Sequence, residues 1–272
     1  MKGFDPSYIY KSDPEKGILV AIQDANIQEF DERLLKLGDL RTPSKPLDAL
    51  SVFFDLEGFT DFARQVDPQL TVPSFISEFI AWIFSTIRTE FTQSSKKKTL
   101  WAELPVFSKF MGDGVLFLWK LDLDKIIGIE PKRPTDKIQY EIQEFICNII
   151  ASLLDVCVKY RDFNEEVCTR FVSPPPRVRC GIARGTVIPI GHNADFVGPC
   201  INIAARLQKF YGLSFAFSAR GIDSVGFSES YRKKFLKKRS AIRGIGEKEL
   251  IYVLKDEFKN LDAEDKKHLS NP

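Results

Sequence analysis

Two aspartates stand where short apolar runs end or turn, a placement that suits metal binding. Asp55 is near the end of LSVFFDL (50–56), and Asp113 lies in Gly112-Asp113-Gly114 between PVFSKFM and VLFLWKL. If these runs are neighbouring strands, both carboxylates meet at one edge of a sheet and suit Mg²⁺ or Mn²⁺. The alternative is that Asp55 caps a helix and Asp113 is only a turn residue.

The turn that follows Asp55 is a candidate phosphate site. Glu57-Gly58-Phe59-Thr60 connects the strand-like run to a segment with apolar periodicity over 75–91. Such strand-to-helix corners present backbone N–H groups to phosphate oxygens. We therefore expect a strand, a turn and then a helix here.

The remaining elements follow from periodicity and turn residues. Two β-rich runs around the Asp-Gly turn predict a hairpin with Asp113 at its tip. Residues 137–160 have helical apolar spacing, and CINIAARLQKFYG predicts a helix that Gly212 caps. RVRCGIARGTVIPIG predicts two strands around Arg184-Gly185, and SFAFS and KELIYVL predict two more. The order β-α-β-β-α-β with appended strands indicates a ferredoxin-like α+β sandwich.

Length and composition set the limits of the domain organisation. With 272 residues the chain suits one sizeable domain with extensions, or two small ones. The proline-containing segment 41–46 predicts a linker, which divides the chain into an extension (1–46), a main domain (47–256) and a polar C-terminal tail (257–272). Thirty-nine basic and 37 acidic residues give a net charge of +2, so we expect no nucleic-acid or membrane partner.

Cysteine and histidine usage argues against other metal chemistry. The five cysteines form no CxxC pair and there are only two histidines. This predicts neither a zinc cluster nor a disulfide framework. The acidic and proline-containing start is unlike a signal peptide, so we expect a cytoplasmic protein.

Five segments together resemble the class III nucleotidyl cyclases. They occur in the order that the family has and span about residues 50 to 255: FFDLEGFT (53–60), KFMGDG (109–114), RCGIARG (179–185), DFVGPCINIAARL (195–207) and RGIGEKELIYVL (243–254). The resemblance implies an enzyme that converts a nucleoside triphosphate into a 3′,5′-cyclic nucleotide and pyrophosphate at a homodimer interface.

The same resemblance assigns the anionic half of the site. Asp55, Asp113 and the Leu56 carbonyl would hold two Mg²⁺ or Mn²⁺ ions. The phosphate cradle would consist of Glu57, Gly58, Phe59 and Thr60. Both sets would come from one subunit.

The other half of the site would come from the opposite subunit. Asn202 resembles the ribose-orienting asparagine and Arg206 the transition-state arginine of the family. Arg243 matches the first basic position of its terminal motif and would bind the triphosphate, whereas the second such position is Ile245 here. The alternative is that Asn202 caps its helix and Arg206 forms a surface ion pair.

Lys109 and Asp195 fall on the two base-reading positions. Lysine only donates and a carboxylate only accepts, so each of the four bases can satisfy the pair. The segment 66–84 and the DLEGFT turn resemble the pyrimidine cyclases of bacterial anti-phage signalling. That resemblance implies UTP as substrate and cyclic UMP as a second messenger that a separate effector protein reads.

Three alternatives remain from the sequence. An adenylate cyclase fits the Lys109 and Asp195 pair, and an inactive cyclase-like nucleotide-binding module would need to have lost a site residue. A diguanylate cyclase needs a GGDEF-like turn, where this chain has MGDGV.

Overall fold

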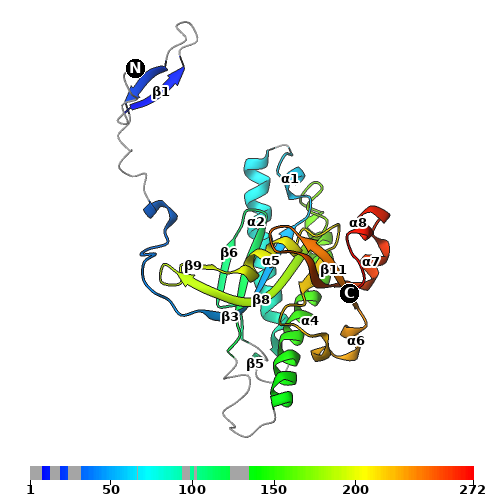
Figure 1. Cartoon of the computed structure of the whole chain (residues 1–272). Helices are drawn as coiled ribbons and strands as arrows, with labels where there is room; N and C mark the ends of the chain where they lie inside the picture. The colour runs from blue at the N-terminus through cyan, green and yellow to red at the C-terminus, as the bar shows by residue number, and fades with distance from the viewer. Residues whose placement is uncertain are drawn as a thin grey trace. The chain divides into compact units, whose positions relative to one another are not determined.

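A computed structural model describes residues 8–12, 19–23, 32–65, 67–93, 99–100, 103–122 and 135–272. The chain divides into two units: Met1–Lys45 with Ile188–Val197, and Pro46–Val187 with Gly198–Pro272 (Figure 1).

The first unit contains the N-terminal extension and a short hairpin. Strands β1 (Tyr8–Ser12) and β2 (Leu19–Gln23) pair antiparallel, and the 3-10 helix η2 (Glu32–Leu35) follows. Strand β9 (Asp195–Val197) pairs with the last residues of β8 (Val178–Ile190). Asp195 therefore belongs to this unit.

The second unit is built on one mixed sheet. Its strands run in the order β11-β12-β10-β8-β3-β7-β6. Besides β8, these are β3 (Leu47–Leu56), β6 (Phe107–Phe110), β7 (Gly114–Lys120), β10 (Phe215–Ser218), β11 (Phe235–Ile242) and β12 (Gly246–Leu254). The larger helices are α2 (Pro68–Glu90), α4 (Thr135–Val167) and α5 (Pro199–Leu207). Shorter elements are α1 (Phe59–Phe62), β4 (Thr92–Gln93), β5 (Thr99–Leu100), η3 (Ser224–Gly226), α6 (Glu229–Arg232), α7 (Lys255–Asn260) and α8 (Ala263–Lys267).

The chain order confirms the predicted ferredoxin-like core. β3, α2, β6, β7, α4 and β8 follow one another as β-α-β-β-α-β, and their strands lie in the order β8-β3-β7-β6. The strands β10, β12 and β11 extend the sheet beyond β8. The predicted helix over 75–91 begins earlier, at Pro68, and the helix over 137–160 extends to 135–167.

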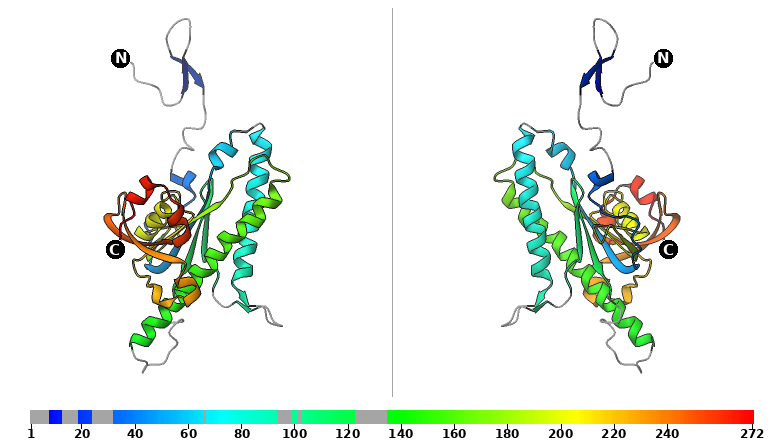
Figure 2. Two further views of the ribbon diagram at one scale, coloured as in Figure 1. Left: turned by 90° about the vertical axis from the view of Figure 1, so that its right-hand side faces the viewer. Right: turned by 90° about the vertical axis from the view of Figure 1, so that its left-hand side faces the viewer.

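The helices divide between the two faces of the sheet (Figure 2). Alternate residues of β3 point to opposite faces. Leu50, Val52 and Phe54 join the core cluster with residues of α2 and α4. Ser51 donates to Cys200 Sγ of α5 at 3.2 Å, so the residues of β3 that alternate with Leu50, Val52 and Phe54 face α5. Asp55 alternates in the same way as Ser51 and therefore also faces α5.

Helix α2 covers the sheet with one apolar stripe. Phe75, Phe79, Ile83 and Ile87 recur at helical spacing and are at most 3% exposed. The helix is long and apolar enough to pass a length and composition test for a membrane span. Its buried stripe packs into the core cluster instead, in agreement with the predicted core helix.

The two strands expected around Arg184-Gly185 were a wrong prediction, because β8 is continuous through both residues. Arg184 and Gly185 pair with Leu50 and Ala49 of β3. The glycine allows a close approach, since a Cβ on Gly185 would lie 3.1 Å from Cys200 Cβ. A Cβ on Gly181 would lie 2.2 Å from the Ala204 carbonyl oxygen. These glycines let α5 dock directly on β8.

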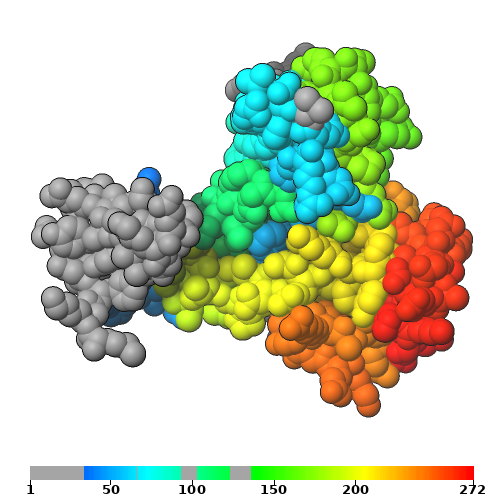
Figure 3. Space-filling view, turned by 90° about the horizontal axis from the view of Figure 1, so that it is seen from above, coloured from blue at the N-terminus to red at the C-terminus, as the bar shows by residue number. Residues whose placement is uncertain are grey.

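The C-terminal residues fold back onto the sheet edge. Ser270 and Arg239 of β11 exchange two backbone hydrogen bonds of 2.9 Å, and Leu269 is 3% exposed. Lys238 donates to Asn271 at 2.9 Å. Figure 3 shows the red C-terminal segment lying against the orange segment that contains β11. The polar residues after 256 thus pack against the main domain.

Candidate metal and nucleotide site

Two neighbouring strands bring Asp55 and Asp113 together. Asp55 pairs with Gly114 across β3 and β7, and the Leu56 N–H donates to the Asp113 carbonyl at 2.9 Å. Gly114 is required at this crossing, because a Cβ would lie 2.2 Å from the Phe54 carbonyl oxygen. Asp113 lies in the hairpin turn before β7, where Met111 N–H donates to Gly114 O at 2.8 Å. The predicted meeting of the two aspartates at one sheet edge is therefore present.

A single ammonium group joins both carboxylates. Lys209 Nζ lies 3.4 Å from Asp55 Oδ1 and 3.8 Å from Asp113 Oδ2. The Asp55 side chain is 3% exposed, whereas those of Asp113 and Lys209 are 33% and 53% exposed. One cation thus reaches a buried and a half-buried carboxylate from the solvent side.

Further ion pairs extend from Asp55 to the following turn. Arg179 of β8 donates to Asp55 Oδ2 through Nη2 and, at 3.2 Å, through Nε. Arg179 Nε also lies 4.0 Å from Glu57 Oε2, which accepts from Arg177 Nε at 2.5 Å. Six residues thus form one connected network of ion pairs: Arg177, Glu57, Arg179, Asp55, Lys209 and Asp113.

Burial raises the pKa of the Asp55 carboxyl above its ordinary value, and the neighbouring Asp113 adds to the rise. The hydrogen bond and charge of Arg179 and the charge of Lys209 act in the opposite direction. Two carboxylates this close repel each other and lose hydration, so the ionised pair needs cations beside it.

The predicted phosphate cradle forms a sharp turn into α1. Gly58 has φ of 75°, in the left-handed region that glycine adopts without strain. Within the described residues, no hydrogen-bond acceptor contacts the backbone N–H groups of Gly58, Phe59 and Thr60. The N–H of Glu57 donates to Arg177 O at 3.1 Å, so it is not available to a phosphate. Any cradle would rest on the other three residues.

Asn202 and Arg206 lie on an exposed stripe of α5. The helix begins after Gly198, so Asn202 is not its N-cap. Asn202, Arg206 and Lys209 follow one another at helical spacing, and all three are exposed. In the part of the chain that the structure describes, neither Asn202 nor Arg206 makes a side-chain hydrogen bond or ion pair, so the alternative of a surface pair does not apply there.

Arg243 lies at the opposite end of the sheet from Asp55. It is exposed in the turn between β11 and β12, where Ile242 pairs with Gly246. β12 runs antiparallel to β10, and β10 runs parallel to β8, whose first residues pair with Asp55 and Leu56. The start of β12 is therefore remote from the Asp55 end. The structure does not bring Arg243 to the aspartates of its own chain.

Lys109 shares a sheet face with Asp55. It pairs with Leu116 of β7, which pairs with Phe53 of β3, two residues before Asp55. Directly paired residues point to the same face, and two strand spacings are about 10 Å. Asp195 lies in the other unit, where its carboxylate accepts from the Phe196 N–H at 2.9 Å. The joint action of Lys109 and Asp195 stays a prediction.

Two solved structures resemble this chain. The adenylyl cyclase CyaB from P. aeruginosa superposes with a TM-score of 0.51 at 13% identity, over 78% of this chain and 96% of that chain. A bacterial light-regulated adenylyl cyclase gives 0.51 at 15% identity, over 80% of this chain and 53% of that chain, so this chain spans about half its length. No protein-family model and no curated protein sequence matches the chain.

The chain has the cyclase catalytic fold. At these identities the likeness concerns the architecture alone, and it agrees with the predicted class III catalytic domain. On this fold, Asp55 and Asp113 lie at the ends of adjacent strands and Asn202 and Arg206 lie on α5. The roles of these residues are argued below.

The donor set of the cyclase fold here fits Mg²⁺ or Mn²⁺. These hard ions take oxygen ligands and bind through one or two carboxylates together with substrate phosphates. Asp55 and Asp113 supply carboxylates, and the place between them already holds the positive charge of Lys209. Among the described residues no cluster of three or more His, Cys, Asp or Glu is found.

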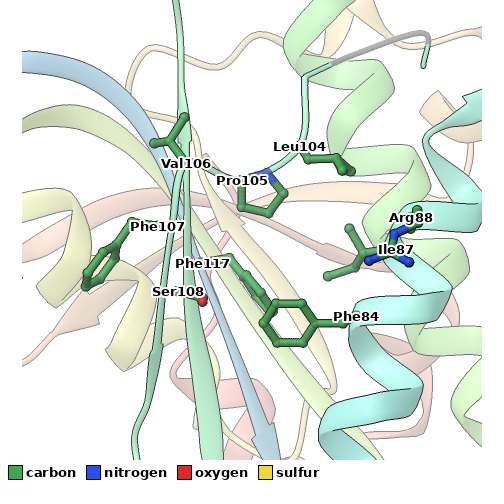
Figure 4. A pocket seen from close by; sticks show the side chains of 9 residues that line it. All are labelled: Phe84, Ile87, Arg88, Leu104, Pro105, Val106, Phe107, Ser108 and Phe117. Carbon is green, nitrogen blue, oxygen red and sulfur yellow. The ribbon is translucent and has the colours of Figure 1, made fainter. Parts of the chain in front are cut away.

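A separate pocket of about 200 Å³ lies on the other face of the sheet (Figure 4). Its lining includes Phe84 and Arg88 of α2 and Phe117 of β7, and the rings of Phe84 and Phe117 lie 5.2 Å apart. Phe117 belongs to the core beneath α2, whereas Asp55 faces α5. None of the predicted site residues lines this pocket.

Sequence reasoning gave no role to three cations of the site: Arg177, Arg179 and Lys209. Arg179 stands within RCGIARG, just before the small residues that α5 covers. This position indicates a role at the site only once it is known which face of the sheet Arg179 lies on. Lys209 follows Arg206 by three residues and lies in the turn after α5, which ends at Leu207. Its contact with Asp113 joins distant segments of the chain and has no local signal.

Proposed function

We propose that this chain is a nucleotidyl cyclase that closes a nucleoside triphosphate into a 3′,5′-cyclic monophosphate and releases pyrophosphate. One observation carries the proposal: Asp55 and Asp113 meet around one positive charge at the α5 face of the sheet. The cyclase fold and the ordered segments support the same conclusion.

The anionic half of the site would bind two Mg²⁺ or Mn²⁺ ions. Asp55, Asp113 and the Leu56 carbonyl are the proposed ligands. When bound, the ions would lower the pKa of the ribose 3′-OH and neutralise the triphosphate. The N–H groups of Gly58, Phe59 and Thr60 are available for phosphate oxygens, and Glu57 would act through its ion pairs with Arg177 and Arg179.

Arg179 is well placed to contact the triphosphate. Its side chain is 20% exposed, and it donates to the carboxylate that would hold the metal. Its guanidinium has five donors, so it can keep Asp55 and still donate to a phosphate oxygen. We assign it a phosphate-binding role beside the metal site.

The cationic half would come from a second copy of the chain. Asn202 would orient the ribose, and Arg206 would stabilise the charge that develops on the α-phosphate during in-line displacement. Arg243 would bind the triphosphate. All three are exposed, and Arg243 lies at the sheet end remote from Asp55 of its own chain. In a homodimer whose sites each combine two chains, these residues would contact the substrate that the aspartates of the other chain hold.

We infer UTP as the preferred substrate and cyclic UMP as the product. Lys109 would donate to uracil O4 and Asp195 would accept from N3–H. The position of Lys109, about two strand spacings from β3, leaves room for the sugar between base and phosphates. The resemblance of segment 66–84 to anti-phage pyrimidine cyclases motivates this choice. It also implies a cytoplasmic second messenger in anti-phage defence that a separate effector protein reads.

Adenylate cyclase is the second candidate. Lys109 and Asp195 equally satisfy adenine, whose ring nitrogen accepts and whose amino group donates. Both similar structures named above are adenylyl cyclases, which favours testing ATP beside UTP.

The deciding experiment incubates the purified protein with each of the four labelled nucleoside triphosphates and Mn²⁺. We expect a cyclic nucleotide and pyrophosphate, with UTP consumed fastest in four-way competition. A predominant cyclic AMP product would overturn the pyrimidine assignment alone. Bound but unconverted triphosphate in every case would favour the inactive nucleotide-binding module.

A further inference from the structure

Lys209 occupies the place that a cation between the two aspartates would take. Its Nζ is 3.4 Å from Asp55 Oδ1 and 3.8 Å from Asp113 Oδ2. Its side chain is 53% exposed, so it reaches the pair from solvent and is not held by packing. A long side chain of this kind can leave without disturbing the core.

The contact of Lys209 with the two aspartates balances their negative charge. Asp55 is 3% exposed, and an uncompensated buried carboxylate is costly. Arg179 compensates one carboxylate through a hydrogen-bonded pair. Lys209 compensates the second and also bridges to the first. The two cations balance the two carboxylates without any metal ion.

We propose that Lys209 is a built-in counter-cation that holds the two aspartates together without metal and that a divalent cation must displace. This inference rests on the metal site of the proposed function. Displacement follows from electrostatics, because an ammonium and a dication cannot share the same two oxygens at contact distance.

The displaced ammonium keeps a second use at the same site. Lys209 follows Arg206 by three residues, in the turn just after α5 ends at Leu207. Binding of metal and triphosphate brings phosphate oxygens to the place where Lys209 loses its carboxylates. Lys209 would thus pair with the two carboxylates in the metal-free site and with phosphate oxygens once metal and substrate are bound.

The test measures Mn²⁺ binding to the full-length protein without nucleotide, from the free Mn²⁺ signal in electron paramagnetic resonance. Lys209→Met removes the competing charge and keeps most of the chain length. We expect Mn²⁺ to bind about three- to tenfold more tightly, the range of a partly exposed ion pair that contacts two carboxylates. Lys209→Arg keeps the charge and should stay near the wild-type affinity.

Thermal unfolding gives a second measurement. Metal-free Lys209→Met should unfold at a lower temperature than the wild type, because it leaves Asp113 without its cation and Asp55 with Arg179 alone. Mn²⁺ should raise its unfolding temperature by more than it raises that of the wild type, because tighter binding to the folded state stabilises more. Lys233→Met is the matched control, since Lys233 pairs with Glu229 on an exposed helix at 2.5 Å.

The outcomes separate the two proposals. Equal Mn²⁺ affinity in wild type and Lys209→Met, with binding lost in Asp113→Ala, would overturn the counter-cation role and leave the metal site standing. Mn²⁺ binding that survives Asp113→Ala would overturn both, and so would the absence of Mn²⁺ binding from every variant both without and with a nucleoside triphosphate. A gain in affinity that Lys233→Met also shows would assign the effect to net charge and overturn the role of Lys209.

Discussion

The two halves of the candidate site differ in what they contact. Asp55 and Asp113 lie in a connected network with Arg179 and Lys209 of the same chain. Asn202, Arg206 and Arg243 are exposed, and none of them makes a side-chain ion pair or hydrogen bond within the described residues. One half is held by ion pairs within the chain, and the other is exposed and unpaired among the described residues.

This difference bears on how the fold is used. Polar side chains on a rigid helix and a tight turn lose less conformational freedom on binding than side chains on long loops. The Arg243 turn lies at the sheet end away from Asp55. Rotation of a second copy about a two-fold axis can bring the cationic half of one chain to the anionic half of the other.

Removal of either aspartate should abolish cyclisation. We expect Asp55→Ala and Asp113→Ala to lose on the order of a thousandfold in kcat/KM, because each removes a charge that would hold metal. Asp113→Ala is the cleaner variant, since its side chain is 33% exposed and, among the described cations, contacts Lys209 alone. Turnover and thermal unfolding are measured on the same samples.

Asp162→Ala is the matched control for charge, because its side chain is 71% exposed on α4. It should keep wild-type turnover. Turnover near the wild-type level in Asp113→Ala, with metal still required, would exclude the two-aspartate site.

The second prediction joins the two halves in a mixed dimer. Asp55→Ala and Arg206→Ala proteins should each be inactive, and mixing them with subunit exchange should restore about a quarter of wild-type activity, because half of the dimers are mixed and each has one intact site. Activity is followed against time after mixing. Asp55→Ala mixed with Asp113→Ala should stay inactive, since both changes affect the same half. No recovery after demonstrated exchange would mean that each site lies within one chain.

The third prediction concerns the base. Lys109→Ala and Asp195→Ala should each lower the preference for UTP over ATP about tenfold or more, because a polar group of the bound base that loses its partner on the protein discriminates strongly. Competition among the four triphosphates measures the ratio. The requirement for Mn²⁺ should persist, since neither residue is assigned to the metals. An unchanged base ratio in both variants would remove these residues from the base pocket.

Local signals explain which parts of this structure could be predicted. The Asp-Gly turn and the β-rich apolar run 50–56 predicted a hairpin and a strand, and thus the meeting of Asp55 with Asp113. Gly185 misled the prediction, because its small size serves the approach of Cys200 rather than a turn. The contact of Lys209 with Asp113 depends on how α5 docks, which no local pattern contains.

The fourth and smallest effect is expected at Arg243. Arg243→Ala should raise KM about three- to tenfold with little change in kcat, because an exposed arginine that binds the triphosphate equally before and in the transition state contributes uniform binding. Lys248→Ala is the matched control, since Lys248 is an exposed cation on the same hairpin. Steady-state kinetics with saturating Mn²⁺ separates KM from kcat. Equal KM values in Arg243→Ala, Lys248→Ala and wild type would mean that the turn between β11 and β12 does not reach the substrate. The difference from the cyclase family that Ile245 shows would then apply to the whole terminal motif. A fall in kcat with unchanged KM would instead place Arg243 beside Arg206 in stabilising the transition state, which makes the cationic half larger than proposed.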